Sequence, residues 1–63
     1  MYRPLTRTDL NAIAAELVGT DNDLQVTMGE LGLDLYHYGV SDVLAWLRQD
    51  YGLVLVDDRW VLE

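Results

Sequence analysis

The chain contains no cysteine and no lysine, and it has one histidine among its 63 residues. Without cysteine no disulfide can form, and neither a thiolate group nor a histidine cluster is available to hold a metal ion. No motif joins a serine and a carboxylate to the lone His37, which we interpret as a solvated or hydrogen-bonded loop residue. The sequence therefore predicts no catalytic residue, no metal site and no cofactor.

Long apolar runs are also missing. No stretch approaches the roughly 18 residues that a membrane-spanning helix needs, and the first seven residues lack the apolar segment of a signal peptide. Because 51% of the residues are hydrophobic, the chain is too apolar for a disordered acidic tail. We expect a folded cytoplasmic protein with a single domain over residues 1–63.

A chain of this length buries only about 60% of the surface that its unfolded form exposes. Its stability must then come from close packing or from association, so a homodimer is one expectation. The charge is also unbalanced, with 11 acidic residues against four arginines and a formal net charge of −7. Two explanations stay open: a high-GC or salt-adapted genome, or a surface that binds a basic partner.

The first expected element is a helix over residues 6–18. Thr6 and Asp9 have the spacing of a capping box, and Gly19 suits the end of the helix. The residues that recur on one helical face are Leu10, Ile13, Ala14 and Leu17.

The next segment predicts a brief strand followed by a second helix. Apolar and polar residues alternate over 24–26, which favours a short strand. Thr27 and Glu30 repeat the capping-box spacing and predict a helix over about 27–33, which two glycines keep short.

Residues 34–39 are expected to form a loop, and a third helix is expected over 41–51. Ser41 is a good N-cap and Gly52 a good helix end. The apolar face of this helix is expected to consist of Val40, Val43, Leu44, Leu47 and Tyr51.

The remaining residues predict a β-hairpin with strands over 53–56 and 59–62. Asp57 and Asp58 form its two-residue turn. In that register Leu55 lies opposite Trp60, and Leu53 lies opposite Leu62 on the same face. We expect this face to cover the helices and the other face to expose three valines, Val54, Val56 and Val61.

This order of elements resembles that of the winged helix-turn-helix family, and the resemblance covers nearly the whole chain. It rests on the helix from Thr6, the strand candidate at 24–26, the short helix from Thr27, the helix 41–51 and the hairpin that follows Gly52 directly. The resemblance implies an α+β domain of three helices and a wing. It also implies DNA binding, with the third helix in the major groove and the wing beside the phosphates.

The surface that would meet DNA departs from this pattern. Off its apolar face the third helix offers one arginine against two aspartates, and the wing tip is Asp57-Asp58, which would repel phosphate. We therefore expect a winged-helix scaffold that binds another protein, as an inhibitor, adaptor or antirepressor such as a phage encodes. The expected partner-binding residues are Trp46, Val54, Val56, Val61, Asp57 and Asp58.

Trp46 has two interpretations, because it lies off the expected apolar face of its helix. It is either an exposed binding residue or a residue that packs under the wing or against Tyr36.

Two alternatives remain at this point. A dimeric DNA-binding regulator from a salt-adapted or high-GC organism would use Arg3, Arg7, Arg48, Gln49 and Arg59. More remotely, residues 39–52 resemble the serine-bearing helix of acyl carrier proteins, which implies phosphopantetheine on Ser41, although a hairpin follows where two further helices are needed.

Overall fold

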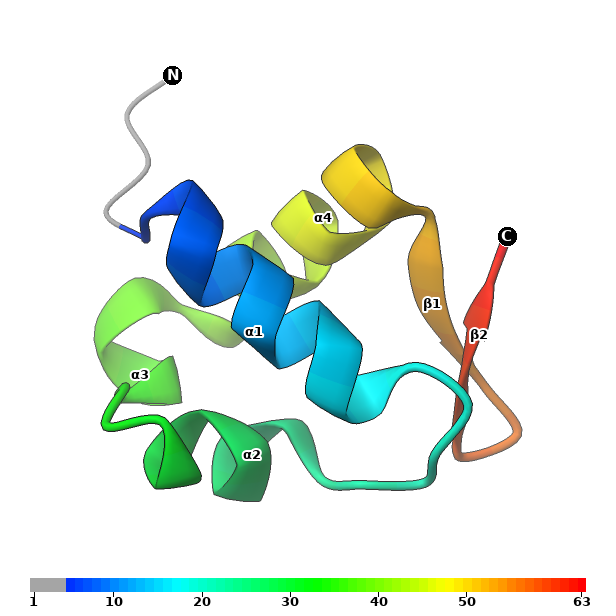
Figure 1. Ribbon diagram of the computed structural model, residues 1–63, viewed down its shortest axis with the longest axis horizontal. Helices are drawn as coiled ribbons and strands as arrows, with labels where there is room; N and C mark the ends of the chain where they lie inside the picture. Colours follow the sequence, from blue (N-terminus) through cyan, green and yellow to red (C-terminus); the bar gives the residue numbers. More distant parts are fainter. Residues whose placement is uncertain (1–4) are drawn as a thin grey trace.

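The computed structural model describes residues 5–63. These form helices followed by a two-stranded antiparallel hairpin, which confirms the α+β class. Their order is α1 (Arg7–Leu17), α2 (Leu24–Glu30), α3 (Leu35–Tyr38), α4 (Val40–Tyr51), β1 (Leu53–Val56) and β2 (Arg59–Leu62) (Figure 1). The hairpin lies at one end of the helices, next to the loop that joins α1 to α2.

Helix α1 begins as its sequence predicts. The Asp9 N–H donates to Thr6 Oγ1 at 3.1 Å, and the Thr6 N–H donates to Asp9 Oδ2 at 3.4 Å, so both halves of the capping box are present. Gly19 follows the helix with a φ of 76°, a left-handed conformation that glycine adopts without strain. The expected apolar face is buried at Leu10, Ile13 and Leu17.

The prediction for residues 24–33 is wrong: there is no strand at 24–26, and α2 begins at Leu24 rather than Thr27. Asp23 caps the helix, since its Oδ1 accepts hydrogen bonds from the backbone N–H groups of Gln25 and Val26 at 2.8 and 3.2 Å. Capping four residues earlier, at Asp23 instead of Thr27, places Leu24, Thr27 and Met28 on one buried helical face. Burial of that face decides between two caps of similar local quality.

The expected connection at 34–39 contains the short helix α3. The Asp34 carboxylate accepts a hydrogen bond from the Tyr36 N–H at 3.0 Å and so caps it. Gly39 then occupies the N-cap position of α4 without a side-chain hydrogen bond, so Ser41 does not cap α4 as predicted. The end of α4 is confirmed, with Gly52 in the left-handed conformation at a φ of 67°.

The buried face of α4 is rotated from the expected one. Val43, Trp46 and Leu47 are buried, whereas Val40 and Leu44 are 40% and 38% exposed. Both sets have helical spacing, and the set that contains the large indole removes more apolar surface from water. Trp46 therefore joins the core, and Leu44 moves to its edge.

The hairpin has the predicted register. Leu53 pairs with Leu62, Val54 with Val61, Leu55 with Trp60 and Val56 with Arg59. The turn residues Asp57 and Asp58 both have positive φ, at 51° and 63°, as a two-residue hairpin turn of type I′ requires.

The α1–α2 loop holds the outer edge of β2. The Trp60 N–H donates to the Thr20 carbonyl, and the Gly19 N–H donates to the Trp60 carbonyl, both at 2.8 Å. The indole of Trp60 is 2% exposed and belongs to the same buried cluster as the helices. The hairpin thus packs on its own chain through Trp60 and Leu53.

Candidate docking groove

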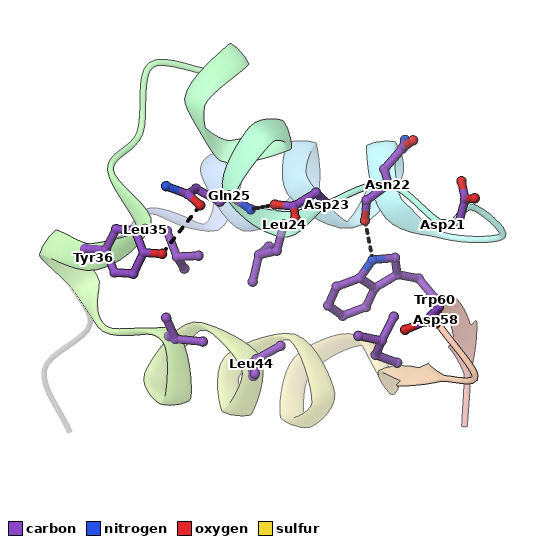
Figure 2. A pocket seen from close by; sticks show the side chains of 12 residues that line it. Asp21, Asn22, Asp23, Leu24, Gln25, Leu35, Tyr36, Leu44, Asp58 and Trp60 are labelled. Carbon is purple, nitrogen blue, oxygen red and sulfur yellow. Dashed lines mark hydrogen bonds between the residues drawn. The ribbon is translucent and has the colours of Figure 1, made fainter.

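An open groove with a volume of about 470 Å³ runs between the start of α2 and helix α4. Figure 2 shows Leu24 and Leu44 on its opposite sides, with Tyr36 at one end and Trp60 at the other. Its apolar lining consists of Leu24, Leu35, Val40, Leu44, Leu55 and Trp60. Its polar lining consists of Asp21, Asn22, Asp23, Gln25, Tyr36 and Asp58. We call this feature the docking groove.

The apolar lining has a buried part and an accessible part. Leu24 and Leu35 belong to the core, with exposures of 8% and 6%. Val40, Leu44 and Leu55 are 40%, 38% and 51% exposed, and they come from α4 and β1. A partner that covered these three side chains would remove a contiguous apolar surface from water, which favours binding.

Polar contacts fix both ends of the groove. At one end the indole Nε1–H of Trp60 donates to the Asn22 carbonyl at 2.8 Å. At the other end the hydroxyl of Tyr36 donates to Gln25 Oε1 at 3.4 Å, while its ring is 67% exposed. The end of the groove at Trp60 is therefore held in place in the free protein, so a partner does not have to order that end.

The charged residues that line the groove are all acidic. Asp21, Asp23 and Asp58 are exposed, and no arginine lies among the lining residues. Asp23 is engaged as the cap of α2, whereas Asp21 and Asp58 come from the α1–α2 loop and the hairpin turn. The groove thus combines an apolar floor with negative charge near Trp60.

Only part of the expected binding surface is exposed. Trp46 is 4% exposed and lies in the core, so the interpretation that it packs inside the protein holds and its role as an exposed binding residue is wrong. Val56 is 49% exposed, whereas Val54 and Val61 are half-buried. The three valines therefore do not form the exposed face that the alternation predicted.

The opposite face of the hairpin, which was expected to cover the helices, is also only partly buried. The helices cover only a diagonal of it, Leu53 and Trp60, and leave Leu55 and Leu62 51% and 64% exposed. Leu55 thereby reaches the docking groove, together with Asp58 from the turn. Asp57 is exposed at the turn but is not part of the groove lining.

Two of the arginines expected to contact DNA are held in ion pairs. Arg7 lies 3.6 Å from the Asp50 carboxylate, with its guanidinium 5.7 Å from the ring centre of Tyr51. Arg48 meets the Glu63 carboxylate through two contacts of 3.4 and 3.3 Å. These contacts join α1 to α4 and α4 to the end of the hairpin.

Among the other residues singled out in the sequence, Gln49 lines a second hollow together with Arg48 and Glu63. Gln49 and Arg59 are exposed on α4 and β2, and Arg3 lies outside the described residues. Ser41 is exposed in the first turn of α4. His37 is exposed in α3, with its ring edge-on to Tyr38 at 5.0 Å between ring centres.

The sequence did not predict the docking groove, because two of the residues that line it were expected to be buried in the core. Leu44 was expected on the buried face of its helix, and Leu55 on the covered face of the hairpin. One signal was available: Val43, Trp46 and Leu47 also have helical spacing, and choosing that face exposes Leu44.

No protein-family model matches this chain, and no curated protein or solved structure matches it. Over residues 5–63, no helix is both long enough and apolar enough to cross a membrane. The docking groove is therefore the feature of this chain that points to a function.

Proposed function

We propose that this chain is a winged-helix-like domain that acts by binding another protein through the docking groove. Helices α2 and α4 would form the helix-turn-helix pair, and the hairpin would form the wing. The pairing of residues 19 and 20 with β2 supports this arrangement, because it attaches the wing to the loop after the first helix. An inhibitor, adaptor or antirepressor would use such a domain.

The observation that carries the proposal is the chemistry of the docking groove between α2 and α4. Val40, Leu44 and Leu55 are partly exposed there, and the adjacent turn carries Asp57 and Asp58. Binding to DNA gains most of its non-specific affinity from cations that neutralise phosphates. A partly exposed apolar surface with carboxylates at its edge suits a protein partner instead.

The proposal is tested by capture from a lysate of the source organism, with and without nuclease and at two salt concentrations. The wild-type chain is compared with Leu44→Glu in the groove and with Leu62→Glu, the same substitution at an exposed leucine outside it. We expect one protein to be captured after nuclease treatment, lost with Leu44→Glu and retained with Leu62→Glu. Equal capture by the two variants, both folded by circular dichroism, would contradict the proposal.

DNA binding is the alternative outcome of the same experiment. It would use Arg48, Gln49 and Arg59, and it would require Arg48 to exchange the Glu63 carboxylate for a phosphate. Nucleic acid that is captured by wild type, lost on nuclease treatment and weakened by salt would favour this alternative. The same capture should then fall with Arg48→Ala and Arg59→Ala together.

A further inference from the structure

We infer that the docking groove receives a partner segment that carries a large apolar side chain next to arginine or lysine. This inference rests on the proposed function and specifies the chemistry of the partner. It follows from the shape of the groove and from the sign of the charges around it.

The shape of the groove favours a segment of polypeptide. Its volume of about 470 Å³ is open to solvent, and Leu24 and Leu44 face each other across it. Pockets for small ligands have volumes of about 300–1,000 Å³, so this groove has room for a few apolar side chains of a bound segment. Apolar side chains of the partner would lie between these leucines and reach Leu55, which is 51% exposed.

The acidic residues that line the groove favour a basic partner segment. Figure 2 shows Asp58 beside Trp60 at one end of the groove and Asp21 on the adjoining loop, with its carboxylate turned away from the groove. Among residues 5–63, no arginine lines the groove. A cationic side chain that lay beside Trp60 would be attracted by these carboxylates, an interaction that salt screens over about 10 Å at 0.1 M. An acidic segment would be repelled at the same place.

The same charges disfavour a second copy of this chain as the occupant. Each copy carries a formal net charge of −7, and each groove has the same acidic edge. Two copies that met through this surface would bring like charges together, which costs binding free energy. Charge complementarity therefore favours a different, basic protein.

The inference is tested with random peptides displayed on phage and selected on the full chain. Enriched peptides are synthesised, and their affinities are measured by calorimetry at low and at moderate salt. The groove variants are Leu44→Glu, Leu55→Glu and the double variant Asp21→Asn with Asp58→Asn. The matched control is Glu16→Gln with Glu30→Gln, which makes the same change in net charge at exposed positions outside the groove.

We expect the enriched peptides to place arginine or lysine beside a large apolar residue. Neutralising Asp21 and Asp58 should weaken their binding about threefold to tenfold at low salt, as for two exposed ion pairs, and the control should change it less than about twofold. Added salt should weaken binding to wild type more than binding to this double variant.

Two results would overturn the inference, and they differ in what they mean for the proposed function. If Leu44→Glu and Leu55→Glu abolish binding while the Asp21 and Asp58 variant and salt do not affect it, the groove binds protein but not a basic segment. If no enriched peptide depends on Leu44 or Leu55, with both variants folded, the inference and the proposed function both fail.

Discussion

The indole N–H of Trp60 donates a hydrogen bond to the backbone carbonyl of Asn22, with 2.8 Å between nitrogen and oxygen. The backbone of Trp60 also pairs with Gly19 and Thr20, so one residue of β2 is tied to the α1–α2 loop by three hydrogen bonds. These bonds hold the hairpin against the helices. They also fix the end of the docking groove at which Asp58 lies.

Trp60→Phe should lower the free energy of unfolding by about 1–3 kcal/mol, because it removes the indole N–H that bonds the Asn22 carbonyl and also empties part of a buried site. The measurement is urea denaturation followed by circular dichroism. Tyr36→Phe is the control, since it removes an exposed hydroxyl and should change stability by no more than about 0.5 kcal/mol. Equal losses in the two variants would mean that the Trp60 bond does not anchor the hairpin.

The hairpin turn should be open to stabilisation. Asp57 and Asp58 both have positive φ, which an aspartate adopts less readily than asparagine or glycine. The double variant Asp57→Asn with Asp58→Gly should be more stable than Asp57→Asn with Asp58→Asn, by up to about 1 kcal/mol in the free energy of unfolding. Its midpoint of thermal unfolding should therefore be higher. The two double variants carry the same charge, so their difference reports the backbone at position 58 alone. Identical midpoints would argue against the left-handed turn.

The cap of α2 should matter more than the serine in the first turn of α4. Asp23→Ala removes an acceptor of two backbone N–H groups and should cost about 0.5–2 kcal/mol. Ser41→Ala is the comparison, because Ser41 makes no cap in this structure, and it should stay within about 0.5 kcal/mol of wild type. A larger loss with Ser41→Ala in urea denaturation would restore the start of the third helix that the sequence predicted.

Substitution of Trp46 should reduce stability, whereas substitution of Leu44 should reduce binding of the partner. Trp46→Ala empties a buried site and should cost about 3–5 kcal/mol, enough to unfold much of a chain this small. Leu44→Ala, at a position that is 38% exposed, should leave the fold intact and weaken partner binding. The measurements are circular dichroism and capture of the partner. A folded Trp46→Ala chain with lost binding would place Trp46 in the binding surface after all.

The parts of the fold that could be predicted are those that local patterns decide. The capping box at Thr6 involves neighbours three residues apart, and the two-residue turn at Asp57-Asp58 sets the hairpin register. The start of α2 and the rotation of α4 were predicted wrongly. For α2 two capping residues were available, and for α4 two sets of residues have helical spacing; burial against the rest of the chain chooses in both cases.

The docking groove depends even more on which faces of α4 and of the hairpin pack against the rest of the chain. Leu44 reaches the groove because Trp46 takes the core side of α4, and Leu55 reaches it because only a diagonal of the hairpin is covered. Neither fact follows from local spacing. The negative charge of the groove was foreseen in part, since Asp58 was an expected binding residue and does line it.

Two-dimensional NMR shows directly whether this chain binds a protein through the docking groove. The isotope-labelled chain is titrated with the captured partner, and changes are followed at the leucine methyl groups and at the arginine and glutamine side chains. The account predicts that the signals of Leu24, Leu44 and Leu55 change while that of Leu62 stays fixed. Changes confined to Leu62, or to Arg48, Gln49 and Arg59, would contradict it.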